Sequence, residues 1–226
     1  MFNKVENLLL IYSADKGALK VLLEKKEDEP YKGYWIIPGG ILESDISQRD
    51  FSIELFEDIT SLTNNEIIQG GVFSKVDRNP FERVIAIVSV MITDKDVADL
   101  NKKKNYSWFD INELPKLAYD YKEIIEEVTN ETKDKIIGNY SNILTKFFPS
   151  DFTLPELQLF YENVLGKKID RRNFRKKIMT QNYVIDTGEK TASGTGRPGT
   201  LYRFDIENLK GKRLWIKMVG VLKTLF

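Results

Sequence analysis

The sequence predicts two domains. The first is an α/β domain with a mixed sheet between helices, and the second is a winged helix-turn-helix domain. Three observations support this prediction. Apolar strand-like runs and amphipathic helical stretches share the first part of the chain, to about residue 120. A capped helix, a four-residue turn and a basic helix then follow one another. Two strand-like segments around a glycine-rich tip come last and predict the hairpin of a wing.

The charge of the chain is divided between its two parts. The whole sequence has 34 Lys and Arg against 34 Asp and Glu. Residues 145–226 hold 16 of these cations and 8 of the acids, which leaves 18 and 26 for residues 1–144. We therefore expect an effector-sensing domain over residues 1–120, a connecting helix and linker over 121–148, and a DNA-binding domain over 149–226.

Two residue types are missing from the sequence, Cys and His. Without Cys there are no disulfides, thiolate nucleophiles or zinc–thiolate sites, which fits a reducing cytosol. Without His the usual general base and commonest metal ligand are gone. The apolar run Leu8 to Tyr12 is too short for a membrane span, and no signal-peptide pattern is present. The sequence predicts a cytoplasmic protein with no membrane partner, no cofactor, no metal and no catalytic residue.

The first domain begins with two apolar strands, Val5 to Tyr12 and Leu19 to Glu24. Gly33 to Glu43 reads as a third strand that is closed by a glycine pair. Ser47 is placed to cap a helix that extends to about Thr60. Spacing predicts that one face of this helix is buried through Phe51, Leu55 and Ile59.

Two further strands and a helix complete the first domain and its connection. Gly71 to Phe73 and Arg83 to Thr93 read as strands, and the second is apolar enough for a central position in a sheet. An amphipathic helix to about Ile137 then leads toward the second domain.

The second domain contains a helix-turn-helix by spacing. Thr153 to Glu156 is a capping box with a proline near the first turn. Gly166 is placed to end that helix, and the turn Gly166 to Ile169 leads into a basic helix that Asp170 can cap.

The basic helix has an apolar back, because Phe174 and Ile178 fall on one narrow face. Arg and Lys neutralise phosphates and pair with guanine edges, and Asn matches adenine. The predicted DNA-binding residues on this helix are Arg171, Arg172, Asn173, Arg175, Lys176 and Lys177. The alternative is a basic helix that only faces solvent.

The predicted wing joins Tyr183 to Ile185 with Thr200 to Phe204, around a tip from Gly188 to Gly199. Arg197 at that tip could enter a minor groove or contact phosphate. Its alternative is an ordinary exposed loop arginine.

The first domain resembles the Nudix hydrolases, in which a glycine loop precedes a helix whose glutamates bind Mg²⁺ against a pyrophosphate. Glu54, Glu57 and Asp58 match carboxylate positions of that motif. The departures are Ile53 for the family's Arg, Thr60 for its Gly, and a loop that is one residue short. Misplaced ligands cannot hold octahedral Mg²⁺, so we expect an inactive site. The alternatives are an active hydrolase of ADP-sugars and a plain solvated acidic face.

Nearly the whole chain, to about Asp205, resembles the Nudix-related transcriptional regulators, which join a Nudix-like sensor to a winged helix. The segments that carry the likeness are Asp77 to Pro80, Trp108, Leu114 to Asp120, Phe152 to Gln158, Tyr161-Glu162, Leu165-Gly166, Asp170 to Arg175, Gly196 to Pro198 and Leu201-Tyr202. The family's Phe-Asp-His is Tyr119-Asp120-Tyr121 here. The resemblance implies a homodimeric repressor that binds double-stranded DNA at a palindromic operator.

Regulators of this family often sense ADP-ribose or related NAD metabolites. A branch in Bacteroidetes has a similarly eroded Nudix motif and responds to L-arabinose. The lost His and the missing phosphate-clamping Arg favour the sugar branch, and the ADP-ribose-responsive repressor is the alternative. The predicted effector-binding residues, which suit hydroxyls and a sugar ring face, are Lys4, Glu24, Trp35, Arg83 and Asp120.

Overall fold

The computed structural model describes residues 4–64, 66–96, 98–100, 105–138, 141–148, 150–192 and 198–209. It divides into two compact units. Unit 1 comprises Met1–Ser13 and Lys20–Thr132, and unit 2 comprises Ala14–Leu19 and Lys133–Phe226. The later division falls inside helix α2 (Tyr121–Gly138), within the segment for which the sequence predicts a connecting helix.

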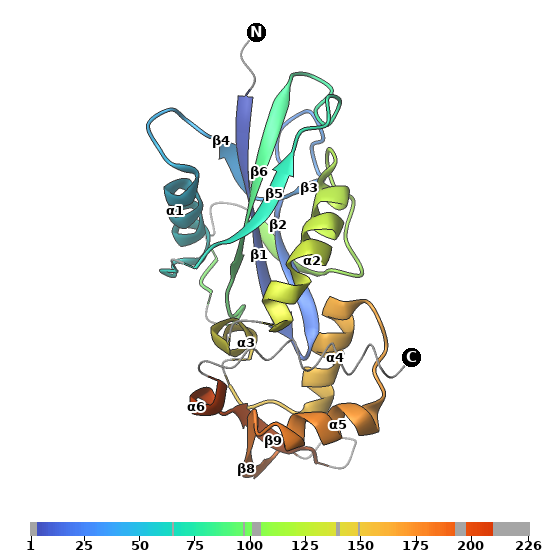
Figure 1. The fold of residues 1–226 in the computed structure, drawn as a ribbon. Coiled ribbons are helices and arrows are strands. Elements are labelled where there is room, and N and C mark those ends of the chain that lie inside the picture. Colours follow the sequence, from blue (N-terminus) through green and yellow to red (C-terminus); the bar gives the residue numbers. More distant parts are fainter. Residues whose placement is uncertain are drawn as a thin grey trace. The chain divides into compact units, whose positions relative to one another are not determined.

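Unit 1 is built on a seven-stranded mixed sheet with α1 (Gln48–Thr60) and α2 on opposite sides (Figure 1). Its strands are β1 (Lys4–Asp15), β2 (Ala18–Lys25), β3 (Trp35–Ile36), β4 (Gly39–Ile41), β5 (Ile68–Phe73), β6 (Val84–Ile92) and β7 (Tyr106–Asp110). The order is β3-β2-β1-β6-β5, with β4 also pairing with β1 and β7 with β2. Strands β1 and β6 are parallel and central. The predicted α/β sandwich is confirmed.

Strand β1 is apolar throughout its middle because both of its faces are covered. Leu9 and Ile11 pack into a core cluster with Phe56 and Ile59 of α1. The Tyr12 hydroxyl lies 2.7 Å from the Thr129 hydroxyl of α2, so the neighbouring β1 position points to the other helix. The alternation of side chains along the strand thus fixes both helices on the sheet.

Helix α1 begins where the sequence predicts, because the Ser47 side chain accepts a hydrogen bond from the Asp50 N–H at 3.1 Å. The predicted buried stripe is only partly right. Ile59 is buried, but Phe51 and Leu55 are half-buried. The other fully buried positions are Ser52, Phe56 and Thr60.

The buried face of α1 is turned toward Ser52 because that serine completes a polar network under the helix. Asn7 donates to Ser52 at 3.1 Å, and the hydroxyls of Ser52 and Ser89 are 2.9 Å apart. Gln48 donates to Asn7 and to Ser89. Buried polar groups of this kind must be paired. The spacing of apolar residues does not predict which polar residues are buried.

Unit 2 has the helices and hairpin of a winged helix, as predicted (Figure 1). Its elements are α3 (Ser141–Phe147), α4 (Leu154–Leu165), α5 (Arg171–Thr180), β8 (Val184–Lys190), β9 (Thr200–Phe204) and α6 (Ile206–Leu209). Strand β8 extends three residues into what the sequence predicts as the tip. Phe152 adds a further bridge, since it exchanges two 2.8 Å backbone hydrogen bonds with Tyr202 of β9.

An aromatic cluster forms the core of unit 2. Phe148 lies between three rings, with centroids 5.1 Å from Phe152, 5.3 Å from Phe160 and 6.2 Å from Phe204. Edge-to-face contacts of this kind join α4 to the hairpin. Over the described part of the chain, no helix is both long and apolar enough to cross a bilayer.

Candidate nucleic-acid interface and sensor site

Helix α5 presents its cations on one side and its apolar anchors on the other. Phe174 and Ile178 are its only buried residues. The Phe174 ring packs 5.7 Å from Tyr161 of α4, which holds the helix against its neighbour. The exposed residues of α5 that the sequence predicts as DNA-binding are Arg171, Arg172, Asn173, Arg175 and Lys176. The predicted faces of the helix are therefore confirmed.

The exposed cations of α5 form no ion pair with acids in the described part of the chain. These cations are Arg171, Arg172, Arg175 and Lys176. Lys177 differs, because it is half-buried on the flank and burial lowers its pKa. Arg197 lies outside the described residues, so its predicted role remains a prediction.

The turn that positions α5 is held by two side chains of α4. Glu162 accepts hydrogen bonds from the Ile169 N–H and from Lys168, both at 3.0 Å, and from Gln158 at 2.9 Å. Gln158 also donates to the Ile169 carbonyl at 3.0 Å. Burial opposes the charge of Glu162, but these donors outweigh it and lower its pKa. The carboxylate thus fixes the chain one residue before the Asp170 cap.

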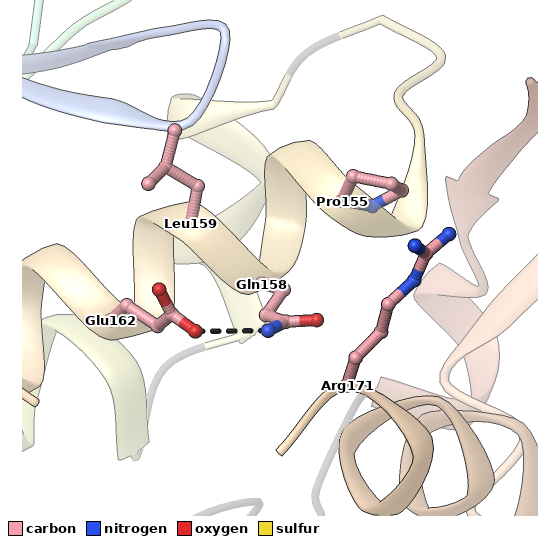
Figure 2. Close-up of a pocket in the computed structure, with 5 residues that line it drawn as sticks. All are labelled: Pro155, Gln158, Leu159, Glu162 and Arg171. Carbon is pink, nitrogen blue, oxygen red and sulfur yellow. Dashed lines mark hydrogen bonds between the residues drawn. The ribbon is translucent and has the colours of Figure 1, made fainter. Parts of the chain in front are cut away.

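A surface pocket lies beside this turn, as Figure 2 shows. Its lining residues are Pro155, Gln158, Leu159, Glu162 and Arg171. Arg171 faces the Glu162–Gln158 pair across the gap between α4 and the start of α5. One exposed cation of α5 therefore adjoins the residues that hold the turn.

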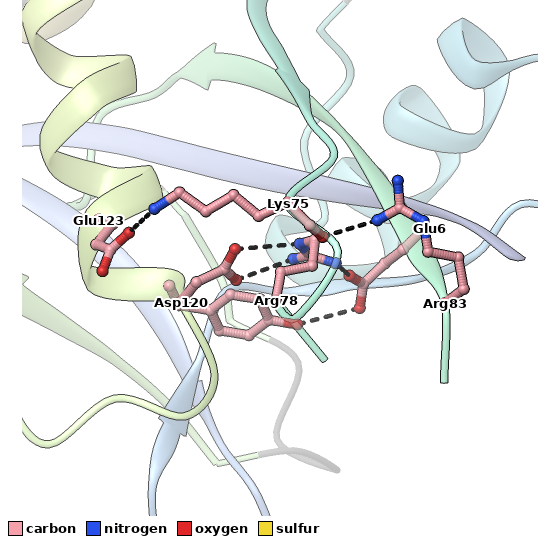
Figure 3. A network of polar contacts seen from close by, with 7 residues as sticks. Glu6, Lys75, Arg78, Arg83, Asp120 and Glu123 are labelled. Atoms are coloured by element: carbon pink, nitrogen blue, oxygen red, sulfur yellow. Dashed lines mark hydrogen bonds and ion pairs between the residues drawn. The ribbon is translucent and has the colours of Figure 1, made fainter. Parts of the chain in front are cut away.

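A largely buried charge network of unit 1 centres on Arg78 (Figure 3). Its guanidinium donates twice to Asp120 and once to Glu6, each at 3.1 Å. The side chain of Arg78 is only 2% exposed, against 12% for Asp120 and 20% for Glu6. Burial disfavours the charge, but Asp120 and then Glu6 outweigh it and raise the pKa of Arg78.

The network joins three separate segments of unit 1. Glu6 lies on β1, Arg78 on the β5–β6 loop, and Asp120 just before α2. The Tyr121 hydroxyl at the start of α2 donates to Glu6 at 3.1 Å, and Lys75 pairs with Glu123 in the same first turn of the helix. The position of α2 is thus tied to β1 by charged and phenolic groups.

The predicted effector-binding residues fall into two groups. Lys4 pairs with Glu82 at 2.6 Å, Arg83 donates to the Lys75 carbonyl at 2.7 Å, and Asp120 holds Arg78, so all three lie around the network. Glu24 and Trp35 instead lie on the paired strands β2 and β3. Trp35 packs against Phe109 with centroids 4.6 Å apart. Their effector role stays a prediction.

The carboxylates of α1 do not form a metal-binding group. Glu54, Glu57 and Asp58 are all exposed on the helix. Within the described ranges, no three Asp or Glu side chains are arranged to hold a metal ion. The inactive Mg²⁺ site that the sequence predicts stays a prediction.

Glu6, Arg78 and Glu162 are the important residues that sequence reasoning missed. Arg78 lies between Asp77 and Asn79-Pro80, a setting that reads as an exposed turn. Glu162 lies near the end of α4, where an acid reads as solvated. At Arg78 and at Glu162, the neighbouring residues in the sequence do not indicate which side chains the residue will contact.

Comparisons with known proteins agree with this architecture. Residues 145–204 match the family model of the NrtR DNA-binding winged helix domain. The ADPR responsive transcriptional repressor NtrR of Acinetobacter baylyi is 24% identical over 206 residues, which cover 88% of this chain and 81% of the relative. The ADP-ribose pyrophosphatase of Methanocaldococcus jannaschii is 32% identical over 109 residues, covering 48% of this chain and 64% of that enzyme.

A solved structure shares the whole fold. The crystal structure of Shewanella oneidensis NrtR complexed with a 27mer DNA superposes with a TM-score of 0.71 at 22% identity. The match covers 94% of this chain and 97% of that one. Both units therefore have counterparts in the same order in one known structure.

Proposed function

We propose that the chain is an NrtR-like DNA-binding repressor controlled by a small molecule bound in unit 1, since residues 145–204 match the NrtR winged helix model and a repressor of this type aligns with 88% of the chain. The observation that carries the proposal is the surface of α5. Four cations and Asn173 stand exposed on a helix that is anchored by Phe174 and Ile178. Side chains of these types at the surface of a helix-turn-helix suit phosphates and base edges in a major groove.

The effector that we propose is ADP-ribose or a related nucleotide sugar. Support comes from the relative in Acinetobacter baylyi, whose name states that it responds to ADPR and which aligns with 88% of this chain. The comparisons do not support the expected kinship with L-arabinose-responsive regulators. L-Arabinose remains the second effector to be tested, because the departures in the Nudix motif first favoured it.

We propose that unit 1 binds its effector without cleaving it. Ile53 and Thr60 replace motif residues, and the acids of α1 are exposed without forming a metal-binding group of three in the described residues. An active hydrolase of ADP-sugars is the rival, since the pyrophosphatase of Methanocaldococcus jannaschii matches this region. Mg²⁺-dependent cleavage of ADP-ribose by the purified chain would favour that rival.

Control of DNA binding requires that the effector bind one conformation better than another. We propose a homodimer that places two copies of α5 in successive major grooves of a palindromic operator. Effector binding in unit 1 then favours an arrangement of the dimer that no longer matches the operator spacing.

The test uses the full chain and a duplex selected by it from a random-sequence library. Fluorescence anisotropy measures affinity for that duplex alone, with ADP-ribose and with L-arabinose. We expect ADP-ribose to weaken binding at least about tenfold, a typical allosteric coupling. An affinity unchanged by either compound at a concentration that raises the melting temperature would refute effector control.

A further inference from the structure

Three tyrosines of unit 1 gather beside the Arg78 network. The ring centroid of Tyr31 lies 4.8 Å from Tyr119 and 5.5 Å from Tyr34. All three side chains are half-buried, and the Lys116 ammonium lies 4.3 Å from the Tyr34 centroid. Tyr119 also lies 5.3 Å from Tyr121. The aromatic cluster therefore continues directly into the charge network.

The backbone holds two of these rings in an unusual conformation. Tyr31 has a φ of 69° and Tyr119 a φ of 50°, and both values lie in the left-handed region that bulky residues rarely adopt. Such residues persist where the surroundings fix them, and they cluster at ligand-binding sites. Tyr31 follows β2 and Tyr119 precedes α2, so two loops far apart in the sequence bring these rings together edge to face.

The neighbouring polar groups keep unused hydrogen-bonding capacity. Arg78 uses three of the five N–H groups of a guanidinium in its bonds to Asp120 and Glu6. Each carboxylate oxygen in these bonds has a further lone pair. The Tyr119 ring is close enough to these groups that burial and then the charge of Glu6 raise its pKa.

The charge of the network decides the kind of ligand. At the centre of the network, the two acids Glu6 and Asp120 lie beside the single cation Arg78. At its edge, Lys75 pairs with Glu123 and Arg83 donates to the Lys75 carbonyl (Figure 3). The nearby Lys4 is already paired with Glu82. A phosphate would meet two carboxylates here, whereas hydroxyl groups can donate to the carboxylates and accept from Arg78.

We propose that Tyr31, Tyr119 and the Glu6–Arg78–Asp120 network form a subsite for a sugar ring. The aromatic rings pack against the C–H face of the sugar, and adjacent hydroxyls bond to the network. This inference rests on the proposed control of unit 1 by a small molecule. A pentose ring reaches such a subsite either as free sugar or as the terminal ribose of ADP-ribose.

Isothermal titration calorimetry on the full chain separates these sources, with L-arabinose, D-ribose, ADP-ribose and ADP as probes. ADP lacks only the terminal ribose. The variants are Tyr119→Ala and Tyr31→Ala, which each remove one ring, and Glu6→Gln, which removes one charge. Tyr119→Phe keeps the ring face, and Glu113→Gln changes an exposed acid outside the network. Thermal unfolding checks that each variant is folded.

We expect Tyr119→Ala and Glu6→Gln to lower the affinity for the probe about tenfold or more. Tyr119→Phe and Glu113→Gln should keep that affinity within about twofold of the wild type. If a free pentose binds the wild type and the variants bind it more weakly, the ligand of the subsite is the free sugar. If the variants bind ADP-ribose more weakly but bind ADP as the wild type does, the ligand is the terminal ribose of ADP-ribose. The proposal is overturned if no probe binds, if the alanine variants bind every probe as the wild type does, or if ADP is weakened equally.

Anisotropy with the selected duplex separates this outcome from the proposed function. Sugar binding that depends on Tyr119 but leaves DNA affinity unchanged would overturn the repressor mechanism and support the subsite. Release of DNA by ADP-ribose that persists in Tyr119→Ala and Tyr31→Ala would support the repressor and overturn the subsite.

Discussion

Arg78 in unit 1 and the arginines of α5 in unit 2 have opposite surroundings. In unit 1, Arg78 is 2% exposed and held by two carboxylates. In unit 2, Arg171, Arg172 and Arg175 are exposed, and no described acid pairs with them. A buried guanidinium that is paired with carboxylates fixes the structure around it, whereas an exposed one is available to an external anion. Burial and pairing, rather than residue type, therefore distinguish a structural cation from a binding one.

The largest effect, a loss of stability, should follow from removing the buried arginine Arg78. Arg78→Met leaves Glu6 and Asp120 as two neighbouring half-buried acids without a cation. We expect it to lower the free energy of unfolding of unit 1 by about 3 kcal/mol, the usual cost of removing one member of a buried pair. Urea unfolding measures this change.

A matched variant controls for the lost volume of Arg78. Adding Glu6→Gln and Asp120→Asn to Arg78→Met removes the repulsion and should recover part of the stability. A loss below about 1 kcal/mol for Arg78→Met alone would mean that the network does not hold unit 1 together.

The second effect concerns the exposed arginines. We expect Arg172→Gln with Arg175→Gln to weaken operator binding about 100-fold without changing the unfolding transition, because neither side chain contacts the core. The slope of log affinity against log salt should become shallower by about two. Lys122→Gln, an exposed cation on α2, is the matched control. Anisotropy at several salt concentrations would contradict the assignment if both variants behaved alike.

A smaller effect should come from the turn before α5. Glu162→Gln keeps the shape of the side chain but loses its charge-assisted bonds to Lys168 and the Ile169 N–H. We expect operator affinity to fall about three- to tenfold, since such bonds contribute modestly. Glu156→Gln in the capping box of the same helix is the comparison variant.

The same carboxylate predicts a dependence on pH. Its pKa in the folded chain is lowered from the ordinary 4.5. The stabilisation is therefore fully present above that value and is lost as the pH falls through the lower folded pKa. Unfolding of unit 2 measured below and above pH 4.5 should show a steeper acid loss for the wild type than for Glu162→Gln. Parallel pH curves would exclude this carboxylate as the cause.

The smallest effect ranks residues within α5. Lys176 is exposed, while Lys177 is half-buried on the flank with a lowered pKa. We expect Lys176→Gln to weaken operator binding about tenfold and Lys177→Gln about twofold at most. The reverse order in anisotropy would mean that a different face of the helix meets DNA.

Local signals account for what the sequence predicted well. The Asp170 cap, the Phe174–Ile178 spacing and the glycine that ends α4 all act within one helical turn. The sequence therefore predicted the bounds of α5 and its exposed face. The apolar run of β6 likewise predicted a central strand, because a strand covered on both faces must be apolar along its length.

Long-range pairing accounts for what the sequence did not predict. Arg78 finds Glu6 and Asp120 across 72 and 42 positions of sequence. The serine and amide network under α1 shifted the buried stripe from the predicted Phe51 and Leu55. Such partners depend on how strands and loops assemble, and one sequence carries no periodic pattern that identifies them.

The most direct test of the account is operator affinity measured on the full chain with and without saturating ADP-ribose, for the wild type and for Arg172→Gln with Arg175→Gln. The account predicts tight, salt-dependent binding that ADP-ribose weakens in the wild type, and weak binding by the variant in either condition. Variant binding as tight as the wild type, or wild-type binding unchanged by ADP-ribose and by L-arabinose, would contradict it.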